Sequence, residues 1–344
     1  MLKYFKSSVA FTLVCLGLAA WLGFSSGGIG GALATVWICA MLAVLEVSLS
    51  FDNAVVNAVV LKDMDPVWRQ RFLTWGMLIA VFGMRILFPL LIVAVAARIG
   101  PIEALRLAIE EPANYQHIIQ GAHAGIMGFG GAFLLLVGLE FFFDADKEHD
   151  WIRLIEEPLK KFGNVESFKI VLTIAALYLV STQMDAAAEA RSFLIAGALG
   201  IVTFFAVEML GNVLEQPVAA DGLKQAGLGA FLYLQVLDAS FSFDGVIGAF
   251  ALSNNLFVIA LGLAIGAMFV RTLTLLLVEN ETLAEYRYLE HGAFWAIIVL
   301  AMIMLVSVLY EVPEAVTGLV GAGLIVLSLA SSIKLNRKQK SRLS

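Results

Sequence analysis

Long apolar runs, separated by short clusters of charged residues, proline and glycine, follow one another along the whole chain. Most of these runs are near the roughly 20 residues that a helix needs to cross the hydrocarbon core of a membrane. The breaks predict about ten transmembrane segments. They lie at about residues 8–24, 32–60, 72–97, 121–143, 170–187, 192–210, 226–251, 256–278, 292–309 and 315–333. The topology depends most on the segment at 170–187, because Gln183, Met184 and Asp185 lie near its end.

Composition excludes whole classes of protein. The chain is 60% hydrophobic and only 15% charged, whereas soluble chains are roughly half apolar and about a quarter charged. A soluble enzyme is therefore excluded. A membrane enzyme is disfavoured, since neither a nucleophile–base pair nor a histidine cluster is present. The net charge of −6 argues against a nucleic-acid partner. We expect a single integral membrane domain over residues 1–344, with the lipid bilayer as its surroundings.

The basic residues give this division an orientation. Of 22 Lys and Arg residues, 17 fall in the loops and termini on one side, three on the other side and two within segments. Since basic residues collect in cytoplasmic loops, both termini should be cytoplasmic. The first segment is similar to a secretory signal, but it has no clean cleavage site before Gly27. We expect it to be retained, and its removal would leave the other segments unchanged.

An acidic motif occurs twice, at a constant offset of 192 residues. The two copies are Glu46-Val-Ser-Leu-Ser50-Phe-Asp52-Asn53 and Asp238-Ala-Ser-Phe-Ser242-Phe-Asp244-Gly245. In the next apolar run, each copy is followed by a glycine and, nine residues later, by an arginine, which is Arg85 or Arg271. A Gly-Ala-Phe sequence also recurs further along. Three matches in one order indicate an internal duplication.

The duplication predicts a particular architecture. Five segment positions separate the two motifs, so the repeats should be inverted relative to one another. Inverted repeats are typical of secondary transporters, which bind their substrates near the midplane. We therefore predict an all-α polytopic protein with two inverted three-helix repeats, at about 32–143 and 226–310. A linker with accessory helices at about 144–225 joins them, and a last helix and basic tail follow at about 315–344.

Helical geometry predicts interrupted helices at the motifs. Glu46 and Asn53 share one face of a straight helix, but Asp52 lies about 120° away. One straight helix cannot direct both acids at one site, so we predict breaks at residues 50–52 and 242–244. For Asp52 alone, a simple helix end is an alternative interpretation.

The residue types indicate a cation site. Carboxylate, hydroxyl and freed carbonyl oxygens suit a hard cation, and acids at membrane depth are costly unless they are partnered. The candidate metal ligands are Glu46, Asp52, Asn53, Asp238 and Asp244, with Ser50 and Ser242 as further oxygens or as helix-packing groups. Arg85 and Arg271 are candidate charge partners, with structural or gating roles. Four acids less two arginines leave a formal −2, which one divalent ion or exchanging protons would balance.

The two motifs and the arginines that follow them resemble the signatures of the TerC family of membrane proteins, named for tellurite resistance. The chain as a whole is similar to a related bacterial subgroup of unknown function. The resemblance covers about residues 32–310 and implies export of a divalent cation, chiefly manganese, with calcium as a second candidate. It also implies a multi-pass protein of the bacterial inner membrane. Gly245 stands where that family usually has serine, which leaves the identity of the metal open.

Two other functions stay open at this point. The substrate could be a small organic cation or an amino acid, since Phe51, Phe241 and Phe243 lie beside the acids. Alternatively, the protein is a scaffold or metal sensor in a stress-response complex, with residues 144–169 and the basic tail as its docking segments. Export by proton antiport is the mechanism we favour. We expect no organic cofactor, and a homo-oligomer is an open alternative.

Overall fold

A computed structural model describes residues 2–62, 64–76, 78–144, 147, 149–161, 166–214, 227–253, 255–279, 282–310 and 312–343. Some side chains within these ranges, that of Asp244 among them, lie outside the described set. Within these ranges the elements are all helices, which confirms the all-α class. Their bounds are α1 Leu2–Leu49, α2 Phe51–Lys62, α3 Pro66–Arg71, η1 Phe72–Gly76, η2 Ile79–Leu87, α4 Phe88–Ala97, α5 Pro101–Glu110, α6 Pro112–Gly121, α7 His123–Phe143, α8 Arg153–Lys160, α9 Glu166–Ser181, α10 Ala187–Leu214, α11 Leu228–Leu252, α12 Leu256–Glu279, α13 Thr282–Glu285, α14 Leu289–Val306 and α15 Glu314–Leu343.

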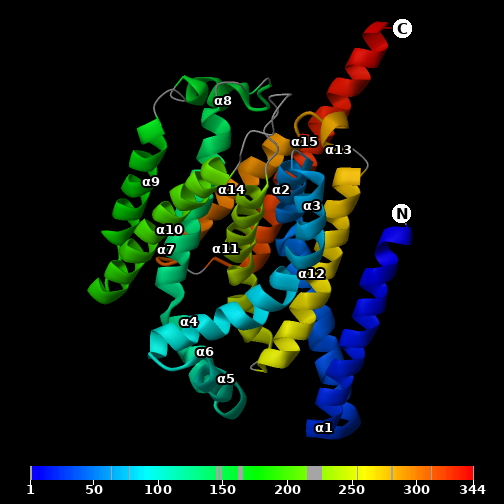
Figure 1. Cartoon of the computed structure of the whole chain (residues 1–344), viewed down its shortest axis with the longest axis vertical. Helices are drawn as coiled ribbons and strands as arrows, with labels where there is room; N and C mark the ends of the chain where they lie inside the picture. Colours follow the sequence, from blue (N-terminus) through cyan, green and yellow to red (C-terminus); the bar gives the residue numbers. More distant parts are fainter. Residues whose placement is uncertain are drawn as a thin grey trace.

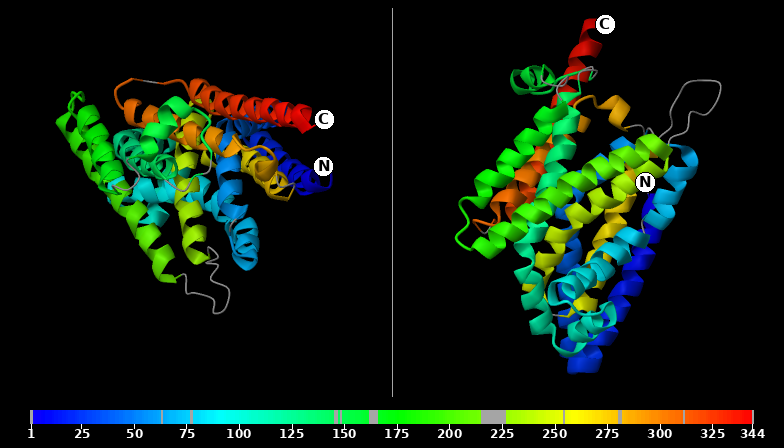
Figure 2. Two further views of the ribbon diagram at one scale, coloured as in Figure 1. Left: turned by 90° about the horizontal axis from the view of Figure 1, so that it is seen from above. Right: turned by 60° about the vertical axis from the view of Figure 1, so that its left-hand side comes forward.

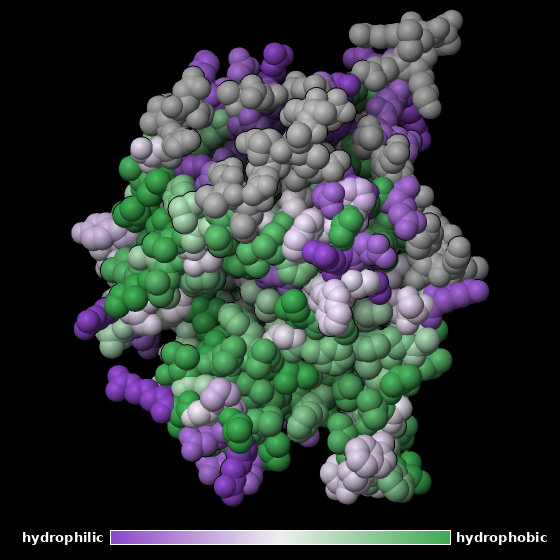
Figure 3. Space-filling model, viewed as in Figure 1, coloured by the Kyte–Doolittle hydropathy of each residue, from purple (hydrophilic) through white to green (hydrophobic). Residues whose placement is uncertain are grey.

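Seven helices in the described part of the chain are long and apolar enough to cross a membrane. Two shorter apolar helices accompany them, at Ser167–Ser181 and Leu228–Ser242. On the face shown in Figure 3, apolar residues form a broad band across the middle of the molecule, with hydrophilic residues toward its two ends. The structure therefore has the helices and the surface of a membrane-embedded protein. The helix expected at 170–187 already ends at Ser181, so the polar residues at 183–185 lie in the turn after it.

The long helices run roughly side by side between two ends of the molecule. The end of α15 and the short helices α8 and α13 lie at the upper end in Figure 1, and α5 and α6 lie at the lower end. The N-terminus lies near mid-height in Figure 1, and the views in Figure 2 agree on a bundle of long helices. The turns at the lower end thus return the chain toward the upper end, where the C-terminus lies.

The first long element, α1, is two helices joined by a sharp reversal at Gly27 and Gly28. Gly28 has φ 61° and ψ −147°, a conformation that is essentially restricted to glycine. Beyond the reversal the two arms pack together, because Thr35 Oγ1 donates to the Ala19 carbonyl at 2.8 Å. A Cβ at Gly23 would lie 2.3 Å from the Gly31 carbonyl oxygen. The arms can therefore approach so closely only because both positions lack a side chain.

We expect Gly23→Ala to destabilise the hairpin by about 1–3 kcal/mol, the usual cost of forcing an extra methyl group into a packed contact. The reason is that the new methyl group meets backbone, which cannot rotate away. Gly17→Ala is the matched control on the same arm, because a Cβ there meets nothing within 4 Å. Thermal unfolding of both variants in one detergent measures the difference. Equal midpoints would contradict the close packing of the arms.

The two acidic motifs differ in their helices. α1 ends at Leu49 and α2 begins at Phe51, so the break expected at residues 50–52 is confirmed at Ser50. The break expected at residues 242–244 is wrong, because α11 is continuous from Leu228 to Leu252. The nearby Ser240 Oγ donates to the carbonyl of Val236 one turn earlier. Serines can thus be accommodated within a helix by bonding to its own backbone.

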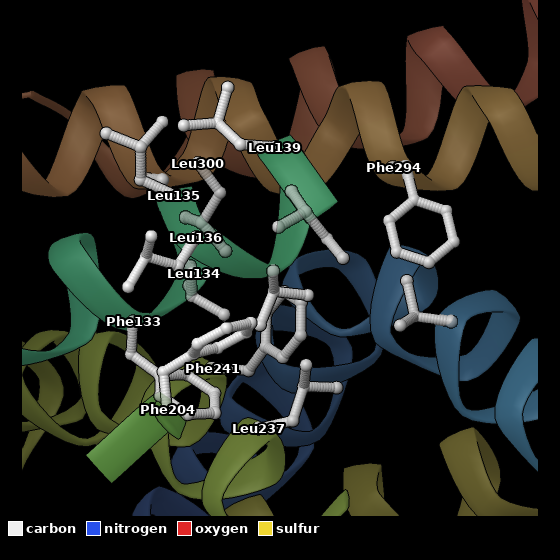
Figure 4. Close-up of a cluster of buried hydrophobic side chains, with 14 of the residues drawn as sticks. Phe133, Leu134, Leu135, Leu136, Leu139, Phe204, Leu237, Phe241, Phe294 and Leu300 are labelled. Atoms are coloured by element: carbon white, nitrogen blue, oxygen red, sulfur yellow. The ribbon is translucent and has the colours of Figure 1, made fainter. Parts of the chain in front are cut away.

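The largest hydrophobic core lies around α7 and α14. Phe133, Leu134, Leu136, Leu237, Leu300 and their neighbours are almost completely buried, and Figure 4 shows these side chains filling the space between helices. Figure 4 also shows Phe241 of the second acidic motif within this cluster. This rigid core holds the motif-bearing α11 in place.

The amphipathic helix α8 is fixed across the upper end of the bundle by one buried carboxylate. Glu156 is fully buried, and its oxygens accept hydrogen bonds from Ile152 N at 3.0 Å, Trp295 Nε1 at 3.0 Å and Lys147 Nζ at 2.9 Å. Burial alone would raise the pKa of Glu156, but these donors outweigh it and hold the pKa below its ordinary value. The ionised form therefore stabilises the docked α8.

We expect α8 to loosen in acid. Because the folded-state pKa is depressed, the stabilisation is complete above the unfolded pKa of about 4.3 and is lost as pH falls through the lower folded value. Hydrogen exchange of residues 153–160, corrected for the intrinsic effect of pH, measures this. Glu156→Gln should reduce the pH dependence to the part that comes from the ion pair of Asp150 with Lys160 of α8. Glu157→Gln, whose side chain is 56% exposed, should leave it unchanged, and a loss in both variants would contradict this role.

Candidate functional site

A polar cavity lies among the helices that carry the two motifs. Its volume is about 30 Å³, which is room for about two water molecules. Side chains from both motifs and from the runs that follow them surround it. The lining residues are Glu46, Ser50, Asn53, Asn57, Phe72, Leu73, Ala80, Arg85, Asp238, Ser242, Ala267, Val270, Arg271 and Thr274.

Glu46 forms a buried ion pair with Arg85. One oxygen, Oε1, accepts from Arg85 Nη2 and, at 3.0 Å, from Ser50 Oγ. The two charged side chains are only 2% and 6% exposed. At Gly266 of α12, a Cβ would lie 2.4 Å from the Glu46 Cβ. Because Gly266 has no side chain, the last turn of α1 can lie close enough to α12 for Glu46 to reach the cavity.

The wall that carries Arg85 has an unusual backbone. η1 and η2 are π-helical, with wider turns than an α-helix, a feature that is frequent at functional sites. Arg85 Nη1 donates to the carbonyl of Ala80, five residues earlier on η2. The guanidinium is therefore held by both the carboxylate and its own helix.

Asp238 is surrounded by amide donors. Its Oδ1 accepts from Asn53 Nδ2 at 3.0 Å and from Asn57 Nδ2 at 2.9 Å. These asparagines are four residues apart on α2 and so lie on one helical face. Because a carboxylate only accepts, both amides must turn their nitrogens toward it. Among the described side chains, no Lys, Arg or His forms an ion pair with Asp238.

Three buried oxygens at the cavity have no partner. They are Asn53 Oδ1, Asn57 Oδ1 and Ser242 Oγ, on side chains that are each at most 8% exposed. A buried polar atom without a partner costs about 1–3 kcal/mol. These atoms therefore indicate that water or an ion is their partner in the functional protein.

Two predicted ligands are not placed at the cavity. Asp52 is buried, but it does not line the cavity. Instead it faces α15, where a Cβ at Gly321 would lie 3.1 Å from Asp52 Oδ2. The side chain of Asp244 lies outside the described residues. Among described side chains, no group of three or more His, Cys, Asp or Glu residues could hold a metal.

The expected charge of −2 counted four acids and two arginines. Among the described side chains, two acids, Glu46 and Asp238, and two bases, Arg85 and Arg271, line the cavity and sum to zero. Asp52 is not in the lining, and the side chain of Asp244 lies outside the described set. A cation at this site would have to compete with Arg85 for Glu46.

The sequence analysis missed Asn57 and Gln235. Asn57 lies four residues after Asn53, a spacing that could have revealed it as a second amide on the same face. Gln235 lies three residues before Asp238 and is buried with both side-chain polar atoms unpaired. A Cβ at Gly76 would lie 2.8 Å from Gln235 Nε2. A glutamine within an apolar run was the available signal.

The fold and the site define an all-helical integral membrane protein with a small polar cavity among its helices. The chain matches the family described as "Protein of unknown function (DUF475)" over residues 51–339 and belongs to that family. No curated protein and no solved structure matches the chain. Glu46 and the α1 hairpin precede the matched range, although Glu46 lines the same cavity as Asp238.

Proposed function

We propose that this protein is a membrane transporter that carries a small inorganic cation, and specifically a divalent cation, through the cavity between Glu46 and Asp238. The observation that carries the proposal is the set of unpaired buried oxygens on Asn53, Asn57 and Ser242. Oxygens from carboxylate, amide and hydroxyl groups are the ligands of hard cations. Helices of membrane length around such a polar cavity favour transport over a scaffold role.

The size of the cavity favours an ion over an amino acid. Space for about two water molecules accommodates a cation that has lost most of its hydration shell. A lysine molecule, with its four methylene groups, needs far more room. The phenyl ring of Phe241 supports the same choice, because it packs into the core cluster and does not line the cavity.

The finer parts of the proposal rest on the sequence. The resemblance of the two motifs to the TerC family supports manganese, with calcium as the second candidate, and supports export across the bacterial inner membrane. The distribution of basic residues supports cytoplasmic termini. Ten crossings follow if α1 counts as two and the helices α9 and α11 also cross. The two motifs then lie on inverted repeats. Protons that move in the opposite direction compensate the charge of the exported cation.

Binding and flux of the purified protein test this proposal. Titration with Mn²⁺, Ca²⁺, Mg²⁺ and lysine in detergent should give saturable binding of at least one divalent cation and none of lysine. Proteoliposomes with a pH gradient should then accumulate that cation, with proton movement in the opposite direction. Absence of binding across the divalent panel would refute the proposal. Flux of lysine would show instead that the substrate is an amino acid.

A further inference from the structure

Arg271 lies in the wall between two hollows. On one side it lines the polar cavity, and on the other it lines a groove of about 220 Å³. Apolar side chains of α1, η1, η2 and α12 make up most of that groove. Leu73 of η1 lines both hollows as well. The boundary between them is therefore the place where these two residues meet.

One hydrogen bond closes this boundary. Arg271 Nη2 donates to the Leu73 carbonyl oxygen at 2.6 Å, across 198 residues of sequence. Arg271 Nε is buried and has no partner, and no described acidic side chain forms an ion pair with Arg271. Its counterpart Arg85, by contrast, has both a carboxylate and a carbonyl. The guanidinium of Arg271 is thus the more weakly held of the two.

The position of this contact suits a gate. Arg271 lies eight residues, or about 12 Å along the axis, before the end of α12 at Glu279. That end lies in the upper half of Figure 1. Glu46 packs against Gly266, which lies five residues, or about 7.5 Å, further from that end than Arg271. A cation entering from this end would pass Arg271 before it reaches Glu46.

The π-helical wall has an exposed outer side. Leu78 and Phe82 are 51% and 48% exposed, and Trp75 is 66% exposed, so their surroundings are lipid rather than packed protein. The wall itself is anchored, because Phe72 of η1 is 1% exposed and belongs to the main hydrophobic core. Space for movement is therefore provided by the groove beside Arg271, into which its side chain can swing.

We propose that the Arg271–Leu73 contact is the gate of the cavity at the end where α12 ends, opened when the Arg271 side chain moves into the groove beside it. Arg271 places a positive charge at this entrance, and an arriving cation replaces that charge as the gate opens. This inference rests on the proposed function for the identity of the ion. The gate controls access to the cavity, whichever ion is carried.

Accessibility of a cysteine at the cavity tests the gate without the transported cation. In a Cys15→Ala/Cys39→Ala background, Ser242→Cys places a thiol at an almost isosteric position in the cavity lining. Ag⁺, a thiol-reactive cation small enough for a cavity of about 30 Å³, is added from the cytoplasmic side of oriented vesicles, and the loss of free thiol is followed over time. We expect Arg271→Gln to raise the modification rate at least tenfold. Arg271→Lys keeps the charge but has a shorter side chain, and it should raise the modification rate about threefold. This second variant keeps the test available if Arg271→Gln fails to fold.

Arg106→Gln is the matched control, because Arg106 is exposed on α5 and its ion pair is with Glu110 of the same helix. It should leave the rate unchanged. Unchanged rates in both Arg271 variants would overturn the gate, as would an equal increase with reagent added from the opposite side. Cation binding is measured separately on the parent protein. If that binding is absent while Arg271→Gln still opens access, the proposed function fails and the gate stands.

Discussion

Replacing Asp238 by asparagine is expected to weaken binding of the divalent cation by on the order of 100-fold, or about 2.7 kcal/mol. The change removes the cavity carboxylate with which no described base forms an ion pair, and with it a charged oxygen ligand. The asparagine oxygen can still accept from the Asn53 and Asn57 amides, so the helices should stay packed. Isothermal titration with the cation that binds the parent protein measures the loss.

Substitutions at two further aspartates provide comparisons for the loss of affinity expected in Asp238→Asn. Asp185→Asn makes the same chemical change at an exposed turn and should not alter the affinity. Asp52→Asn is more informative, because the sequence predicts a ligand there whereas the structure directs Asp52 toward α15. We expect a smaller loss than for Asp238→Asn. An equal loss of affinity would show that Asp52 is also a ligand. Unchanged binding in Asp238→Asn would show that Asp238 is not a ligand.

Arg85→Gln is expected to cost about 3–5 kcal/mol of unfolding free energy, because it leaves the Glu46 carboxylate buried without its partner. The double variant Glu46→Gln/Arg85→Gln should recover most of that loss, since it removes both charges. Denaturant unfolding in a mild detergent, arranged as a double-mutant cycle, gives the coupling between the two side chains. Strictly additive losses would mean that the pair does not act as a unit.

A surface arginine provides the comparison for this cycle. Arg106 also pairs with a glutamate, but its side chain is 74% exposed. Arg106→Gln should give no measurable change, because solvent screens such pairs. A large loss at Arg106 would show that the assay reports arginine removal in general and not burial.

The apolar pattern was enough to predict the helices, because every membrane helix must satisfy its own backbone. It could not decide where a helix is interrupted. The same Ser-x-Ser-x-Asp pattern gives a break at Ser50 and an uninterrupted helix through Ser242. Packing decides between the two. Phe241 and Leu237 fix α11 in the main core, whereas the end of α1 is shaped by its close contact with Gly266 of α12.

The site could be predicted in part, because charged residues in apolar runs must meet partners. Spacing alone could not assign those partners. Arg85 meets Glu46, but the equivalent Arg271 meets a backbone carbonyl instead of Asp238. The amides of Asn53 and Asn57 take that place at Asp238, and an amide pair has no sequence signal comparable to a charge. Asp52 faces away because it lies about 120° from Glu46 around the helix axis, and the bend at Ser50 is too small to bring it back to the cavity.

The Glu46–Arg85 pair also bears on how the chain enters the membrane during synthesis. Glu46 leaves the ribosome 39 residues before Arg85, and a lone charge at the centre of an inserted helix costs about 2.5–3.5 kcal/mol. Both arms of the α1 hairpin should therefore wait beside the insertion machinery until η2 arrives and the two charges can enter together. Arg85→Gln should then lower the yield of inserted protein, and the added Glu46→Gln should restore it. A contact that stabilises the finished cavity would in this way also set the order of its assembly.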